Sequence, residues 1–367
     1  PLNVPPAAGD NAARCDEIRP CVAAPRHGRR AMRGILTVRT MAVHVLTIDG
    51  GGIRGMIPAM ILAEVERRAA RPASVLFHLI AGSSTGALAA AGLAAPGAAG
   101  RPRFSAADVV SLFEDVGAEI FRAPSPQRVR SLNGLVAPRY SGRRLTRFLA
   151  DTFGERWLSE SLTDLLIPGY DLEARRVYFF KSSAARRDPA RDFRLRELVQ
   201  VASSAPMFAP PLRIVSRDGT RARVLTDAGA FIANQAMCAF AELLSTGRAG
   251  EPAVLLSLGT GMVAQPIRYE RVTRWGVLQW AEQLLTLVPD GYNDTIDYQI
   301  RQCLAHFTPG GDRHYYRIQF PLDDVDAMLD NASPRNLAAI RRKAEQVIRE
   351  HSDALDAACA ALVAGAR

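Results

Sequence analysis

Ser84 lies at the centre of the pentapeptide GSSTG (82–86), which fits the pattern G-x-S-x-G. In this pattern the serine occupies a sharp turn from a strand into a helix, and the turn lifts its hydroxyl out of the sheet as a nucleophile. An apolar stretch precedes the pentapeptide and small residues follow it, which suits such a turn. We predict a nucleophile elbow that comprises Gly82, Ser83, Ser84, Thr85 and Gly86, with Ser83 as a turn residue.

A second glycine-rich turn, DGGGIRG (49–55), follows the apolar stretch 43–48. Glycines let backbone N–H groups approach a carbonyl oxygen, and such pre-aimed donors stabilise an oxyanion. The turn also satisfies G-x-G-x-x-G, but a dinucleotide site needs an acidic residue about 20 positions further on, and 69–75 contain none. We therefore interpret the turn as an oxyanion hole in which Arg54 either braces the loop or meets a phosphate, with bracing favoured. The predicted oxyanion loop consists of Gly50, Gly51, Gly52, Ile53, Arg54 and Gly55.

A serine hydroxyl needs a base to become a nucleophile. Asp227 ends the apolar stretch VLT and is followed by Ala228 and Gly229, which form a small turn. A carboxylate that is partly withdrawn from water has a raised pKa and accepts a proton more readily. Among the six histidines, only His306 and His314 stand where a Ser–Asp–His triad could use them. The sequence therefore leaves two candidates for the base that activates Ser84, which are Asp227 alone or one of these two histidines.

The predicted elements bring the two glycine-rich turns together. Apolar stretches at 43–48 and 75–81 are typical of buried strands, and 57–69 and 87–95 have the composition of helices. Two strands joined through one helix are expected to be parallel neighbours. Both turns then lie at the carboxyl edge of the sheet, where open α/β sheets bind their ligands.

The rest of the chain is expected to complete one domain over 41–350. Residues 1–40 lack a hydrophobic period and are predicted to be a disordered tail, while 351–367 are expected to end the last helix and the chain. The last helix is expected to begin at Pro334. Residues 100–170 are expected to be mixed helix and loop that partly cover the site. Further strands are predicted within 177–183, 222–230, 253–261 and 315–320.

Composition limits the partners. The net charge is +9, but only Lys181 and Lys343 are lysines among 46 basic residues, and we attribute this arginine bias to codon usage. No nucleic-acid recognition motif accompanies the arginines. The five cysteines show no metal-ligand spacing, which predicts a reducing compartment and no metal. Because no apolar run could span a bilayer or act as a signal peptide, we expect a cytoplasmic protein whose membrane contact is peripheral.

The motifs DGGGIRG, GSSTG and DAG, in this order, resemble those of the patatin-like phospholipases. The segments SSAPMFAPP (203–211), SLGTG (257–261), DTIDYQIRQ (294–302) and NASPRNL (331–337) agree, so the resemblance extends over about 43–350. It implies a three-layer α/β/α fold around a mainly parallel central sheet. It also implies a Ser84–Asp227 dyad without histidine, oxyanion donors at Gly51 and Gly52, no cofactor, and hydrolysis of acyl esters of phospholipids or lysophospholipids. Ala228 stands where the family usually has glycine.

Three alternatives remain open from the sequence. One is a triad esterase of the α/β-hydrolase kind, and another is a binding or signalling module whose pocket has lost catalysis. The third follows from the resemblance, since some bacterial patatin-like enzymes are phospholipase effectors of phage defence that cyclic nucleotides activate. The sequence does not indicate the oligomeric state.

Deletion of residues 1–40 should leave folding and activity intact, because a segment without an apolar pattern cannot join the core. The melting temperature and the ester hydrolysis of the truncated protein test this expectation. A large loss of either property would show that the segment belongs to the folded domain.

Overall fold

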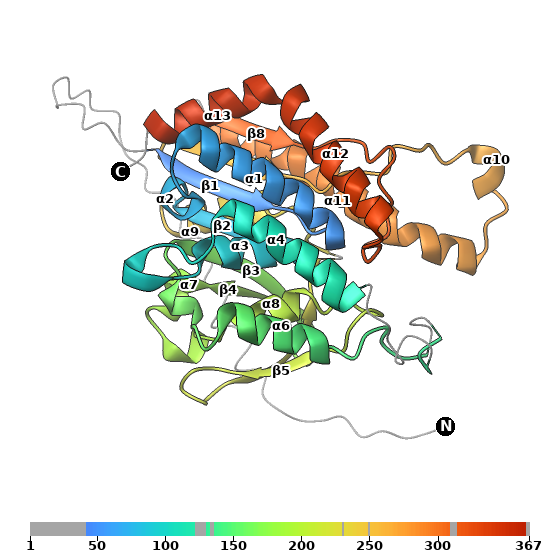
Figure 1. Cartoon of the computed structure of the whole chain (residues 1–367), viewed down its shortest axis with the longest axis horizontal. Helices are drawn as coiled ribbons and strands as arrows, with labels where there is room; N and C mark the ends of the chain where they lie inside the picture. Colours follow the sequence, from blue (N-terminus) through green and yellow to red (C-terminus); the bar gives the residue numbers. More distant parts are fainter. Residues whose placement is uncertain are drawn as a thin grey trace, which may run out of the picture. The chain divides into compact units, whose positions relative to one another are not determined.

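The computed structural model describes residues 42–121, 130–132, 136–229, 231–248, 250–308 and 314–364, so the predicted tail lies outside the described residues. Within these ranges, eight strands form one sheet with the order β5-β6-β3-β2-β1-β7-β8, and β4 pairs with β3 (Figure 1). Near its middle, β1 (Val43–Ile48) pairs in parallel with β2 (Leu79–Gly82) and with β7 (Ala253–Leu258). The predicted parallel neighbours are therefore confirmed, and the turns after all three strands lie at one edge.

The outer strands run in both directions. β3 (Asp164–Asp171) is parallel to β2, and β8 (Tyr315–Ile318) is parallel to β7. β4 (Arg176–Lys181) and β6 (Ala222–Asp227) run antiparallel to β3, and β5 (Leu212–Val215) runs antiparallel to β6. Because β6 runs antiparallel to β3, its last residue, Asp227, pairs with Gly169 inside the sheet.

Helices cover both faces of the sheet, as the alternation of side chains along β1 requires. Val43 and Val45 pack against α9 (Ala236–Ser245) and α11 (Val277–Phe307). Leu46 and Ile48 face the larger core on the other side. The helices of that side are α1 (Met56–Ala69), α3 (Thr85–Ala94), α4 (Ala106–Val116), α6 (Arg143–Phe153), α8 (Leu195–Ala202), α12 (Pro334–Glu350) and α13 (Ser352–Ala364). The three-layer α/β/α fold with a mainly parallel sheet is confirmed.

Short helical turns connect the main elements. They are η2 (Gly52–Gly55), α2 (Ala73–Leu76), η3 (Ala98–Gly100), η4 (Gly117–Phe121), η5 (Leu158–Glu160), α7 (Ser182–Ala185), η6 (Pro189–Arg191) and α10 (Tyr269–Val272).

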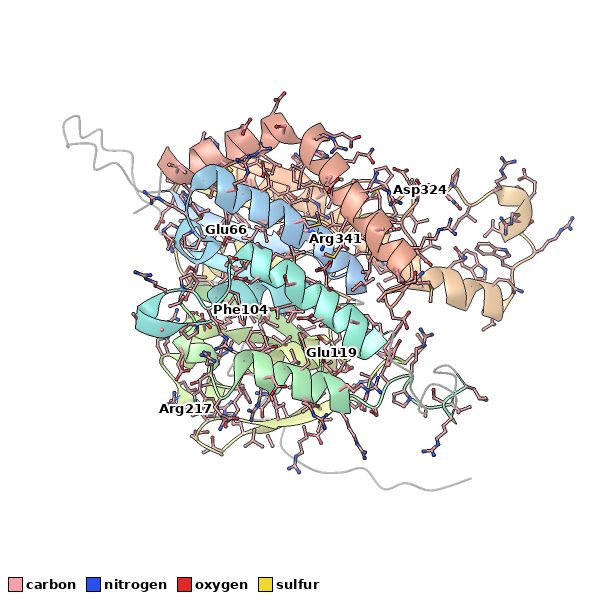
Figure 2. The ribbon with its side chains drawn as sticks, viewed as in Figure 1. Glu66, Phe104, Glu119, Arg217, Asp324 and Arg341 are labelled. Atoms are coloured by element: carbon pink, nitrogen blue, oxygen red, sulfur yellow. The ribbon has the colours of Figure 1, made fainter. Side chains whose placement is uncertain are left out.

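The expected strand 75–81 is wrong in its first half, because Ala73–Leu76 form the helical turn α2. The side chain of Glu66 accepts hydrogen bonds from the amides of Ala73 and Ala106, each at 2.8 Å. It thereby satisfies the free N–H groups at the start of α2 and of α4. Figure 2 shows Glu66 on α1 beside these elements. An apolar run alone cannot reveal such a distant cap.

The end of the chain also differs from expectation. Helix α12 begins at Pro334 as predicted, and Ser333 caps it by accepting a hydrogen bond from the Asn336 amide. That helix ends at Glu350, and 352–364 form a separate helix, α13, instead of the end of one helix and a tail. Burial of Leu355 and Leu362 in the larger core holds α13 in place.

Leu355→Ala should lower the free energy of unfolding by about 2–5 kcal/mol, because it removes buried methyl groups and leaves a cavity. Val363, which is exposed on the same helix, provides the matched control, and Val363→Ala should change stability by less than about 0.5 kcal/mol. Urea unfolding of both variants measures the difference. Equal effects would show that α13 does not pack as described.

Candidate active site

Ser84 occupies the turn between β2 and α3 with backbone angles of φ 49° and ψ −126°. A positive φ is strained for any residue with a side chain and persists only where the surroundings impose it. Here Gly82 and Gly86 allow the turn to close, since a Cβ on Gly86 would lie 2.3 Å from the Ile48 carbonyl oxygen. The strand–turn–helix predicted around Ser84 is present.

Asp227 lies beside Ser84 at the end of β6. The Gly229 amide donates to Asp227 Oδ1 at 2.7 Å, and Ser84 lies close enough for a hydrogen bond from its hydroxyl to lower the pKa of this carboxylate. Burial raises the pKa of Asp227 to about 7, and the two hydrogen bonds only partly oppose this effect. A Cβ on Gly229 would lie 3.1 Å from the Ser84 Cβ, whereas Ala228 is accommodated in a fully buried position.

The glycine-rich loop is fastened from both sides. Its Gly50 amide donates to Ser83 Oγ at 3.1 Å, and Ser83 Oγ donates to the Ala233 carbonyl at 2.9 Å. From the other side, Thr260 Oγ1 donates to the Gly50 carbonyl at 2.8 Å. Ser83 therefore does more than complete a turn, and the sequence analysis had assigned no role to Thr260.

The tip of this loop faces the nucleophile. Gly52 has φ +58°, and a Cβ there would lie 2.1 Å from the Leu329 carbonyl oxygen, so only glycine fits. The Gly51 amide donates to Thr85 Oγ1 at 3.3 Å. Arg54 donates from Nε to the Gly51 carbonyl at 3.3 Å, which supports its bracing role. Burial lowers the pKa of Arg54 to about 10 against the opposing charges of Asp290 and Asp326.

A buried ion pair that the sequence analysis missed lies at the root of the loop. Arg317 on β8 donates to Asp49 Oδ2 at 2.6 Å and to Ser257 Oγ at 2.9 Å. Burial raises the pKa of Asp49, and the charge and hydrogen bond of Arg317 oppose this rise. Asp49 begins the DGGGIRG motif, but its partner stands 268 positions away, where no local signal marks it.

A cavity of about 580 Å³ opens above Ser84. Its lining combines Gly52, Ser84 and Thr85 with apolar side chains such as Leu88, Val116, Ile120, Leu145 and Phe208. Because several of these residues come from 100–170, that segment covers part of the site as expected.

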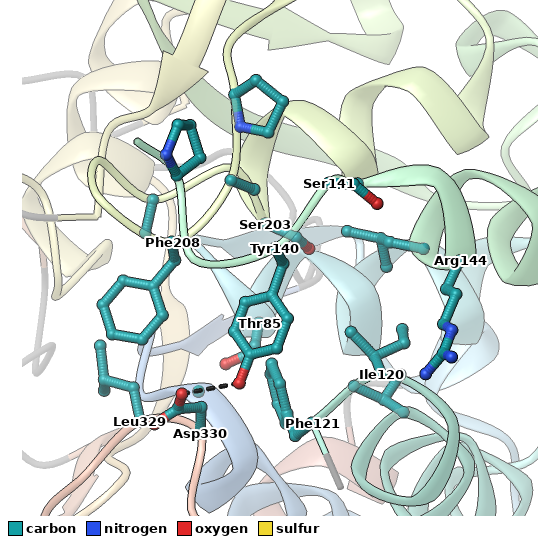
Figure 3. Close-up of a pocket in the computed structure, with 18 of the residues that line it drawn as sticks. Thr85, Ile120, Phe121, Tyr140, Ser141, Arg144, Ser203, Phe208, Leu329 and Asp330 are labelled. Carbon is teal, nitrogen blue, oxygen red and sulfur yellow. Dashed lines mark hydrogen bonds between the residues drawn. The ribbon is translucent and has the colours of Figure 1, made fainter. Parts of the chain in front are cut away.

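One side of the cavity is held by a buried carboxylate. Tyr140 donates its hydroxyl proton to Asp330 Oδ2 at 2.8 Å (Figure 3). Arg139 forms an ion pair with the same oxygen at 2.7 Å. The amides of Arg139 and Tyr140 donate to the carbonyls of Met207 and Phe208. The segment around Tyr140 thereby ties two walls of the cavity together.

The histidines considered for a triad lie elsewhere. His306 and His314 are exposed, and neither lines the cavity. His314 directly precedes β8, and the amino ends of the parallel strands lie at the edge opposite to Ser84. Within the described ranges, no group of three His, Cys, Asp or Glu side chains could hold a metal ion. In the same ranges no helix has the length and apolar character needed to cross a membrane.

The α/β/α fold holds a strained serine beside a buried carboxylate at the carboxyl edge of its sheet, an arrangement typical of serine hydrolases. Residues 46–237 match the family described as Patatin-like phospholipase. The chain belongs to this family, and lipid acyl hydrolysis is the activity that membership supports.

Curated plant proteins are similar over most of their length. "Patatin-like protein 1" of Oryza sativa subsp. indica is 29% identical over 340 residues, which cover 84% of this chain and 81% of that protein. "Patatin-08" of Solanum tuberosum is 25% identical over 336 residues, with 84% of each chain covered. Among solved structures, VipD from Legionella pneumophila aligns over 85% of this chain and 67% of that chain, at 11% identity and a TM-score of 0.34.

Asp227→Asn should raise the melting temperature at pH 8. The folded pKa of about 7 lies above the value of about 3.9 for an unfolded aspartate. The stability that this group contributes is therefore fully present below about pH 4 and is lost as the pH rises through about 7. Asparagine keeps the size without the charge, so its advantage should shrink toward pH 5. Thermal melts across this range measure it, and a variant that is less stable at every pH would contradict the assignment.

Proposed function

We propose that this protein is a serine acyl hydrolase that cleaves acyl esters of phospholipids or lysophospholipids with a Ser84–Asp227 dyad. The closeness of the strained Ser84 to the buried Asp227 carboxylate carries this proposal, since a Cβ on Gly229 would lie 3.1 Å from Ser84 Cβ and 3.0 Å from Asp227 Oδ2. A base whose pKa lies near the working pH is well matched to its task, and that of Asp227 is raised to about 7.

The reaction would proceed through an acyl-enzyme. Ser84 Oγ attacks the ester carbonyl carbon while Asp227 takes the hydroxyl proton. When the tetrahedral intermediate collapses, the ester C–O bond breaks, and Asp227 returns this proton to the leaving alcohol. A water molecule then attacks the acyl-enzyme, with Asp227 again as the proton acceptor. The carboxylic acid leaves, and the proton held by Asp227 restores the Ser84 hydroxyl.

The amides of Gly52 and Thr85 are the best placed oxyanion donors. Both residues line the cavity beside Ser84, and Thr85 is the first residue of α3, where helix N–H groups lack intrahelical partners. The Gly51 amide is already bonded to Thr85 Oγ1. We therefore favour Gly52 with Thr85 over the expected pair of Gly51 and Gly52. The helix dipole of α3 adds further stabilisation of negative charge.

The cavity suits a lipid with a charged head group. Its apolar walls can accept an acyl chain, whereas the residues that line the cavity also include Arg130, Arg143 and Arg144. Arginine is well suited to bind phosphate. These features favour a phospholipid or a lysophospholipid over a neutral ester.

Asp227→Asn should lower kcat by about 10²–10⁴-fold, the usual contribution of general-base catalysis. Ser84→Ala should abolish turnover, whereas His306→Ala and His314→Ala should have little effect. The measurement is hydrolysis of a soluble short-chain ester and of a lysophospholipid by each variant, with melting temperatures as the control for folding.

A triad makes the opposite prediction, because removal of any member that acts in a unit costs as much as removal of the nucleophile. A folded but inactive histidine variant, together with a nearly normal Asp227→Asn, would refute the dyad.

A further inference from the structure

Exposed apolar side chains gather around the edge of the sheet that carries Ser84. Met207 and Met328, each 51% exposed, stand next to residues that line the cavity, and Leu132 and Val136 are more than 60% exposed in the segment before Tyr140. Exposed apolar side chains that form a contiguous surface mark sites for protein or membrane partners. We call these four residues the rim of the cavity.

A second apolar group lies on 262–290, which we call the arm. The arm leaves the carboxyl end of β7 and contains α10 and the first part of α11. Figure 1 shows α10 and the start of α11 extending away from the other helices. Tyr269 is 75% exposed, Val277 84% and Trp280 39%. At the base of the arm, the Met262 amide donates to the Phe320 carbonyl, and the Leu322 amide donates to the Met262 carbonyl. Because Phe320 and Leu322 follow β8, these hydrogen bonds anchor the arm to the sheet.

The first part of the arm, 262–277, combines aromatic rings with a net positive charge, because it holds three arginines against Glu270, whereas Glu282 and Asp290 balance the charge over the whole arm. Arg268, Arg271 and Arg274 alternate with Tyr269 and Trp275, and within the described ranges no ion pair engages these three guanidinium groups. Trp and Tyr favour the boundary between water and hydrocarbon because their rings are apolar and their N–H or O–H groups are polar. Arginine beside them complements the phosphates of anionic lipids. This chemistry fits a bilayer surface better than the surface of another protein.

The base of the arm adjoins the active site. It follows Thr260, whose hydroxyl binds the Gly50 carbonyl. At the other end of the arm, the Asp290 carboxylate interacts electrostatically with Arg54 of the glycine-rich loop. A bilayer that binds the arm would therefore contact the protein at the edge where the cavity opens.

We propose that the arm and the rim together form the surface by which this protein docks on a bilayer that contains anionic phospholipid. Docking places the mouth of the cavity against the lipid head groups, so that an acyl chain can enter above Ser84. Only this last step rests on the proposed function, because docking itself needs no catalysis.

Tryptophan fluorescence can observe the arm directly. The chain has three tryptophans, so Trp157→Phe leaves only Trp275 and Trp280, both in the arm. Ser84→Ala in the same protein keeps the vesicles intact. Titration with phosphatidylglycerol vesicles should shift the emission to shorter wavelength, and pure phosphatidylcholine vesicles should give a weaker response.

Tyr269→Glu combined with Val277→Glu should weaken vesicle binding by at least about tenfold, because two apolar contacts are lost and negative charge is added. Tyr298→Glu is the matched control, since Tyr298 is 67% exposed on the same helix but lies beyond the arm. It should bind vesicles like the parent protein.

Three results would overturn the proposal. The first is an emission spectrum that anionic vesicles leave unchanged. The second is a loss of vesicle binding in Tyr298→Glu that equals the loss in the arm variant. The third is light scattering in which the parent protein is a dimer and the arm variant is a monomer. The last result would assign the arm to a second copy of the chain. Hydrolysis of a soluble ester by protein with Ser84 intact tests the proposed function separately, because arm variants should retain it.

Discussion

The site depends on the parallel pairing of β1 with a strand on each side. Ile48 is in register with Gly82 of β2 and with Leu258 of β7, so the three turns that follow these strands begin at the same level. Ser83 can then accept a hydrogen bond from the Gly50 amide, and Thr260 can donate one to the Gly50 carbonyl. A shift of two residues would displace a strand by about 7 Å, which is more than twice the length of a hydrogen bond. The register of the central strands therefore determines whether the loop and the nucleophile can act together.

Several groups at this edge are held in states that cost stability. Ser84 has a strained φ, Asp227 is a carboxylate almost without solvent contact, and Asp49 and Arg317 form an ion pair in the interior. A buried ion pair contributes little net stability, but loss of one partner leaves an uncompensated charge. Such features persist only because the packed helices on both faces impose them. At Ser84 and Asp227 the strained or desolvated group is also the one that the proposed chemistry needs.

The walls of the cavity are coupled to the glycine-rich loop. The Leu329 carbonyl accepts a hydrogen bond from the Ile53 amide at 2.8 Å, and the next residue, Asp330, holds Arg139 and Tyr140. A change in the segment around Tyr140 would therefore reach the loop that is proposed to bind the oxyanion. The proposed docking surface begins beside these same elements.

Local patterns in the sequence were enough to predict the sharp turn at Ser84, the position of the glycine-rich loop after a strand, and the strand–turn–helix units around both. Hydrophobic period and glycine spacing depend on near neighbours, so a local reading can find them. The same patterns predicted one helix at the end of the chain and a strand over 75–81, and tertiary contacts changed both. Only the tertiary structure decided that Asp227 meets Ser84, since β6 reaches it by running antiparallel to β3. The hydrogen bond from Thr260 to the Gly50 carbonyl and the ion pair of Arg317 with Asp49 likewise join segments that are far apart in the chain. Their hydrogen bonds depend on sheet order and register, which long-range packing selects and no local period records.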